Sequence, residues 1–64
     1  MSKMLEELVG KKVRITDMIL GASFTGTVVE VDDRWLKVEK RNKKGDLVYT
    51  KIVAIESIGN IDIE

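Results

Sequence analysis

The sequence contains no cysteine, no histidine and no proline, and it has one tryptophan, one tyrosine and one phenylalanine. Without cysteine and histidine, the chain can form no disulfide and no ordinary zinc or haem site. No nucleophile is paired with a base, and no glycine-rich phosphate loop is present. We therefore expect a protein with no catalytic residues, no metal and no cofactor, and not an enzyme.

Long hydrophobic runs are also missing. No apolar stretch approaches the roughly 18 residues that a membrane span requires, and no signal-peptide hydrophobic region follows the N-terminus. We expect a cytoplasmic protein without a membrane partner. The 11 Lys and Arg residues balance the 11 Asp and Glu residues. This balance argues against nucleic-acid binding through bulk positive charge, but it leaves room for a local basic patch.

The length predicts a single domain over residues 1–64. A core of this size is expected to contribute only about 3–5 kcal/mol, and small natural domains add disulfides, a metal or oligomerisation. Because the composition excludes the first two, the sequence favours oligomerisation. The alternative is a marginally stable monomer.

Residues 2–10 are predicted to form a short helix, because Met4, Leu5, Leu8 and Val9 share one face and Ser2 can cap the N-terminus. From residue 12 the apolar pattern alternates with a period of two, which is typical of strands. The predicted strands are 12–16, with a weak continuation to 20, then 24–31, 35–40, 47–52 and 58–63.

Two features interrupt the strand pattern. Gly26 lies inside the second strand, where glycine indicates a bulge, a bend or the close approach of another backbone. Ile52, Ile55 and Ile58 recur at every third residue, which favours a helical turn or a bent strand junction over a continuous pleat. The chain is thus expected to be mostly β.

This order of elements resembles the Sm and Sm-like proteins. The resemblance rests on residues 8–15, on the stretch Phe-Thr-Gly-Thr-Val at 24–28, on an aspartate six positions after Gly26, and on Lys51 followed by Ile55 and Ile58. It implies an SH3-like, Sm-like five-stranded bent barrel with a short N-terminal α-helix. It also implies a homo-oligomeric ring of about five to seven copies with single-stranded RNA as the ligand.

The sequence departs from the family pattern at the ligand motifs. Trp35 or Leu36 stands where the family has an asparagine, and Lys51 and Ile52 replace its Arg-Gly pair. Carried over position by position, and with the basic hairpin added, the candidate nucleic-acid-binding residues are Asp32, Arg34, Trp35, Lys43, Lys44 and Lys51. Family rings form when the fourth strand of one subunit pairs with the fifth strand of the next. The candidate interface residues are therefore Val48, Tyr49, Thr50, Ile58 and Ile61.

Each candidate has a second interpretation. Trp35 can stack on a base, or it can cover the end of the barrel or a subunit contact. The basic residues at 37, 40, 41, 43 and 44 can follow phosphates, or they can form a solvated loop. Asp32 and Asp33 are better explained by turn chemistry than by a metal.

A rival function of another class is a protein-interaction or scaffold module with an SH3-like or PRC-type barrel and no nucleic-acid ligand. Zero net charge and the missing asparagine favour this rival.

Overall fold

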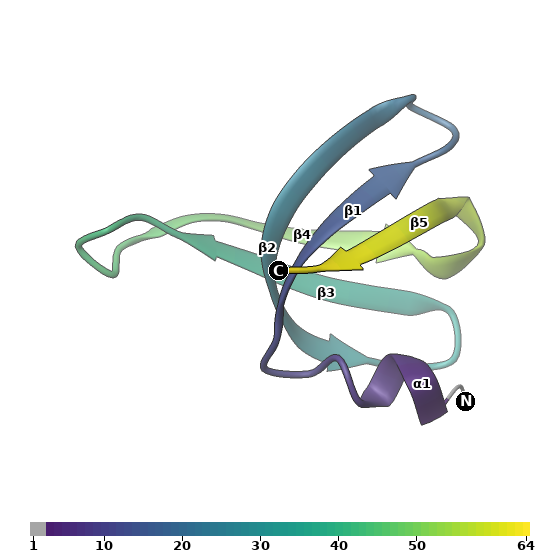
Figure 1. The fold of residues 1–64 in the computed structure, drawn as a ribbon, viewed down its shortest axis with the longest axis horizontal. Helices are drawn as coiled ribbons and strands as arrows, with labels where there is room; N and C mark the ends of the chain where they lie inside the picture. The colour runs from purple at the N-terminus through teal and green to yellow at the C-terminus, as the bar shows by residue number, and fades with distance from the viewer. Residues whose placement is uncertain (1–2) are drawn as a thin grey trace.

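The computed structural model describes residues 3–64 and is mostly β-structure (Figure 1). Its elements in chain order are α1 (Lys3–Glu6), β1 (Lys12–Asp17), β2 (Ala22–Val31), β3 (Trp35–Arg41), β4 (Leu47–Ala54), the 3₁₀ turn η1 (Ile55–Ser57) and β5 (Ile58–Ile63). The five strands form one antiparallel sheet in the order β4-β3-β2-β1-β5. Within residues 3–64, no helix is long and apolar enough to cross a membrane.

The sheet is open. β4 pairs with β3 on one side and β5 pairs with β1 on one side, so both strands are sheet edges. The predicted five strands and short N-terminal helix are confirmed, whereas the predicted closure into a barrel is wrong. Closure requires the first and last strands of the sheet to pair. Here η1 instead carries the chain from β4 to the far side of β1.

The core lies on the concave face of the bent sheet. Alternate residues of the central strands are fully buried there, in keeping with a half-buried pleat. The fully buried side chains are Val13, Ile15, Val28, Leu36 and Val38. Leu8, which follows α1, is also buried against them.

Gly26 lies where β2 exchanges partners. The pairing of β1 with β2 extends to Thr27, and the pairing of β2 with β3 begins at Thr27. A Cβ atom on Gly26 would overlap the Val38 side chain and would lie 2.8 Å from the backbone oxygen of Glu39. The close backbone approach expected for this glycine is confirmed, and it lets one long strand curve across the sheet (Figure 1).

The helix is shorter than the predicted 2–10. After Glu6 the backbone N–H groups of Leu8 and Val9 donate to carbonyl oxygens three residues back, which is a tightened turn. The N–H of Gly10 then donates to the Val28 carbonyl oxygen at 2.7 Å, which ties the chain to β2. The predicted Ser2 cap lies outside the described residues.

The predicted weak continuation of the first strand to residue 20 is also wrong. β1 ends at Asp17, whose carboxylate accepts hydrogen bonds from the backbone N–H groups of Ile19 (2.9 Å) and Leu20 (3.1 Å). Gly21 closes the turn with a positive φ of 67°. Met18, Ile19 and Leu20 are consequently 72%, 78% and 76% exposed.

The threefold spacing of isoleucines does mark a helical turn. Ile55–Ser57 is a 3₁₀ helix, and the hydroxyl of Ser57 donates to the Ala54 carbonyl oxygen at 2.9 Å. Ile55 and Ile58 pack against the core from this turn. The turn therefore anchors the chain between the two edge strands.

Candidate nucleic-acid interface

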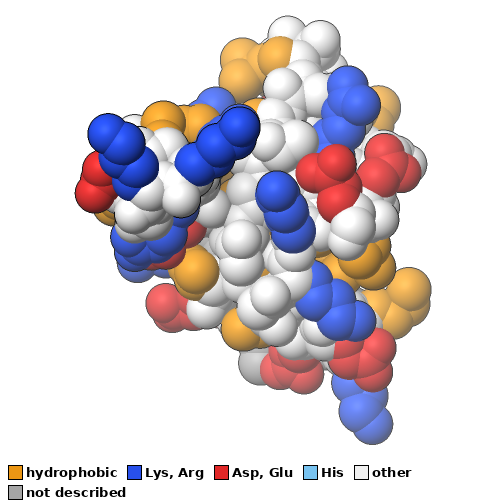
Figure 2. All heavy atoms as spheres, turned by 60° about the vertical axis from the view of Figure 1, so that its left-hand side comes forward, with side chains coloured by type: hydrophobic (Ala, Val, Ile, Leu, Met, Phe, Trp, Pro, Cys, Tyr) orange, Lys and Arg blue, Asp and Glu red, His pale blue; other side chains and the backbone are white. Residues whose placement is uncertain are grey.

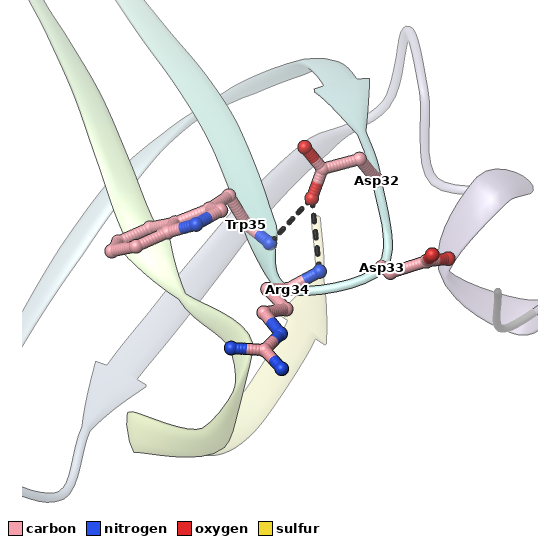
Figure 3. Close-up of a pocket in the computed structure, with 4 residues that line it drawn as sticks. All are labelled: Asp32, Asp33, Arg34 and Trp35. Carbon is pink, nitrogen blue, oxygen red and sulfur yellow. Dashed lines mark hydrogen bonds between the residues drawn. The ribbon is translucent and has the colours of Figure 1, made fainter.

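The turn between β2 and β3 is built around Asp32. One carboxylate oxygen accepts hydrogen bonds from the backbone N–H groups of Arg34 at 2.9 Å and Trp35 at 2.7 Å (Figure 3). The N–H of Asp32 also donates to the Trp35 carbonyl oxygen at 3.0 Å. This is the local turn chemistry expected of aspartate, and it fixes the direction in which β3 begins.

These two backbone donors lower the pKa of the Asp32 carboxyl below its ordinary value of 3.8. A lowered folded-state pKa means that the ionised carboxylate stabilises the fold above the ordinary pKa. That contribution disappears as the pH falls through the lowered pKa.

We expect Asp32→Asn to reduce stability at neutral pH, because an amide oxygen is a weaker acceptor than a carboxylate. The deficit relative to the unmodified protein should shrink as the pH falls below about 4 and on through the lowered pKa of the folded-state carboxyl. Asp32→Ala, which lacks any acceptor, should be less stable than Asp32→Asn. Thermal melts at pH 7 and pH 3 measure both differences. A deficit that does not change with pH would contradict this assignment.

Trp35 is the exposed aromatic residue of this region, with 48% of its surface accessible. Its indole ring leaves the turn along the sheet, whereas the Arg34 guanidinium points in a different direction and Asp33 points away from both (Figure 3). Trp35 lines three adjoining surface depressions. Their other lining residues are Glu30, Asp32, Asp33, Arg34, Lys37, Ile52, Ala54, Ile55 and Glu56.

Strand register separates the predicted site residues into two groups. Trp35 lies opposite Ala54, and Lys37 lies opposite Ile52, which places Trp35, Lys37 and Ile52 on the outer face of the sheet. Lys51 lies opposite the buried Val38 and so points to the concave face. The structure therefore brings Asp32, Arg34 and Trp35 together but places Lys51 on the other face.

Lys51 contacts two aromatic rings on that concave side. Its ammonium nitrogen lies 4.5 Å from the centroid of the Phe24 ring and 5.2 Å from that of Tyr49. Cation–π contacts of this length are favourable. The side chain of Lys51 thus links β4 to the first half of β2.

The remaining basic candidates lie on the hairpin between β3 and β4, which projects from the body of the protein (Figure 1). Figure 2 shows Lys and Arg side chains gathered at this projecting end. Arg41 is held locally, because it donates to Glu39 at 3.1 Å and to the Gly45 carbonyl oxygen at 2.9 Å. Lys43 and Lys44 at the tip are exposed.

The predicted interface residues lie on the two edge strands. On β4, Val48 and Thr50 are exposed, and the half-buried Tyr49 donates its hydroxyl to the Thr25 carbonyl oxygen at 2.6 Å. On β5, Ile58 and Ile61 are half-buried and pack against the core.

The sequence pattern did not identify three further residues that accompany these sites. Ile52 flanks Trp35 on the outer face, and Phe24 and Leu20 flank Lys51 on the concave side. The alternation of side chains along the strand places Ile52 on its exposed face, and this alternation is the sequence signal that could have identified Ile52. No local pattern indicates that Phe24 meets Lys51, because that contact depends on how far the sheet bends.

No group of three or more acidic side chains is placed to hold a metal ion in the part of the chain that the structure describes. The turn and the start of β3 offer instead the aromatic face of Trp35 with Arg34 and Lys37 beside it, and an aromatic face suits a planar ligand. The same depressions are also lined by the carboxylates of Glu30, Asp32, Asp33 and Glu56.

A family model matches residues 1–58, and the chain belongs to that family, which is described as "Domain of unknown function (DUF6897)". No curated protein and no solved structure matches the chain.

Proposed function

We propose that this member of a family without an assigned function is a non-enzymatic, cytoplasmic, Sm-like protein with an SH3-like fold. It assembles into a ring of about five to seven copies and binds single-stranded RNA. The observation that carries the proposal is the strand order, because it leaves β4 and β5 as opposite free edges of one sheet.

The two edges favour head-to-tail assembly. A free strand edge presents unpaired backbone N–H and C=O groups, and pairing with another chain satisfies them. When the pairing surfaces are two different strands of the same chain, each copy still has one free edge, and addition continues until the ring closes. Each edge also has an exposed apolar side chain that an added strand would partly cover, Ile52 on the outer face of β4 and Ile63 on the concave face of β5.

The RNA part of the proposal is supported by the outer face beside the β2–β3 turn. Trp35 offers a flat surface on which a base can stack, and Arg34 and Lys37 supply positive charge next to it. Lys43 and Lys44 extend the basic surface along the projecting hairpin. Repetition of this face around a ring would present one base-stacking position per subunit, which suits a single strand.

The assembly is tested by the absolute mass of the purified protein, measured by light scattering during size-exclusion chromatography. We expect one species with about five to seven times the 7.2 kDa mass of the chain. A monomer at micromolar concentration would contradict the ring and leave RNA binding to be judged on its own.

Trp35→Ala is expected to weaken binding of a fluorescein-labelled uridine decamer by roughly tenfold, because one stacked base is lost. Trp35→Phe should retain most of the affinity. Fluorescence anisotropy measures both, and thermal melts check that the variants remain folded. Equal affinity of the unmodified protein and Trp35→Ala would exclude stacking at this position. Absence of binding by the folded, unmodified protein would exclude RNA as the ligand.

A further inference from the structure

A groove of about 290 Å³ lies on the open side of the sheet. One wall is the first half of β2 together with Leu20 of the preceding turn, and the other wall is the last half of β4. Phe24 and Val53 contribute apolar surface, and Lys51 contributes a positive charge. Asp17 also lines the groove, but its buried carboxylate already accepts hydrogen bonds from the backbone N–H groups of Ile19 and Leu20. The groove exists because the sheet is open, and a closed barrel would lack it.

Both walls of the groove are strand edges without a strand partner. Residues 22–26 of β2 pair with β1 on one side, and the pairing of β2 with β3 starts only at Thr27. β4 pairs with β3 on one side and with no described strand on its other side. Main-chain groups on an unpaired edge are satisfied by an added extended strand, which is the basis of strand-addition recognition of peptides.

The chemistry of the groove selects the side chains of that strand. A strand added beside β4 would place alternate residues next to Lys51 and Val53, which share the concave face. The Lys51 ammonium contacts aromatic rings but no described carboxylate. A carboxylate opposite Lys51 would therefore supply the missing anion, and an apolar side chain two positions away would cover Val53, Phe24 and Leu20.

We propose that this groove binds an extended peptide segment of a partner protein, added as a strand to β4, with an acidic residue opposite Lys51 and an apolar residue two positions from it.

The β5 strand of a second copy does not match this pattern. Its register with β1 places Ile61 and Ile63 opposite Ile15 and Val13, on the concave face. Asp62 alternates with them and points to the other face. Pairing between β4 and β5 would thus bring isoleucines to Lys51. Ring closure and peptide binding would compete for the same edge, and the peptide would be the occupant that complements the lysine.

The probe for the test is a blocked hexapeptide in which a leucine and an aspartate are two positions apart and the other residues are threonine. We expect it to perturb the amide resonances of β4 and of residues 22–25 in an NMR titration. The titration uses Ile63→Lys protein, in which a charge on the β5 edge opposes self-assembly. Peptides with asparagine in place of aspartate, or with N-methylated backbone groups, serve as matched controls.

Lys51→Met, which keeps the aliphatic stem and removes the charge, is expected to weaken peptide binding about fivefold. The same change at Lys12, which is exposed on the outer face of β1 beside the buried Val13, should leave binding unchanged. Resonance changes at β4 that depend on both Lys51 and the peptide aspartate support the proposal. No binding by the folded Ile63→Lys protein overturns it, as does equal binding of the asparagine peptide. Neither result bears on the proposed RNA binding, which is argued from Trp35 on the outer face.

Discussion

Gly26→Ala is expected to cost about 3 kcal/mol of unfolding free energy, which is most of what a core of this size supplies. The added methyl group would lie 2.8 Å from the Glu39 backbone oxygen and would overlap Val38. Val38 is fully buried in the centre of the core, and Glu39 belongs to the ladder between β2 and β3, so neither can move without disturbing other contacts. Urea unfolding followed by circular dichroism should show a midpoint close to zero urea.

Gly59→Ala is the matched control for this experiment. A methyl group there would meet the side chain of Met18, which is 72% exposed and can rotate away. We therefore expect a change below about 1 kcal/mol. If the two variants proved equally stable, the contact at Gly26 would not be what restricts that position to glycine.

Ile63→Lys is expected to convert the proposed ring into a monomer, which is a five- to sevenfold fall in mass if the ring has about that number of copies. Ile63 is 59% exposed on the edge strand β5, so the chain should tolerate a lysine there. If the variant still formed a ring, the introduced lysine of every copy would face a strand of the neighbouring copy. Ile19→Lys is the matched control, because Ile19 is 78% exposed in the β1–β2 turn and lies on neither edge. Light scattering compares the three proteins.

Mixing two edge variants distinguishes a head-to-tail contact from a symmetric one. Ile52→Lys alters β4 and leaves β5 intact, whereas Ile63→Lys alters β5 and leaves β4 intact. Together they contain one unaltered edge of each kind, so an equimolar mixture should form a heterodimer and stop there. A symmetric contact, in which both partners use the same edge, would give no such heterodimer. It would instead give homodimers of a single variant, and the appearance of such homodimers would contradict β4–β5 pairing.

The strands could be predicted from the sequence because alternation of apolar and polar residues is a local property. Val13 and Ile15, Val28, and Leu36 and Val38 are the alternating residues of their strands, and all five are fully buried. The turn at η1 was similarly visible in the spacing of Ile55 and Ile58. The end of β1 could not be predicted, because Met18 and Leu20 continue the apolar alternation. In the structure the Asp17 carboxylate accepts hydrogen bonds from the backbone N–H groups of the following turn, and the strand ends there.

The site was harder to predict because it depends on which face of the sheet each residue occupies. The turn of Asp32, Arg34 and Trp35 is contiguous, so the sequence places it correctly as one unit. Lys51 was grouped with Trp35 because of its matched position in the family pattern, yet the register of β3 against β4 sends the two side chains to opposite faces. Sheet closure depends on the total bend of five strands, and no short motif determines it.

The strand order also has a consequence for the route by which the chain folds. Three of the four strand pairings join neighbours in the sequence, so β1 to β4 can form as successive hairpins with short loops to close. The pairing of β5 with β1 instead joins the two ends of the domain, and its loop-closure entropy is the largest. We therefore expect the docking of β5 to complete folding and its detachment to begin unfolding. A partner that holds β5 in place would slow the first step of denaturation in every copy that it contacts.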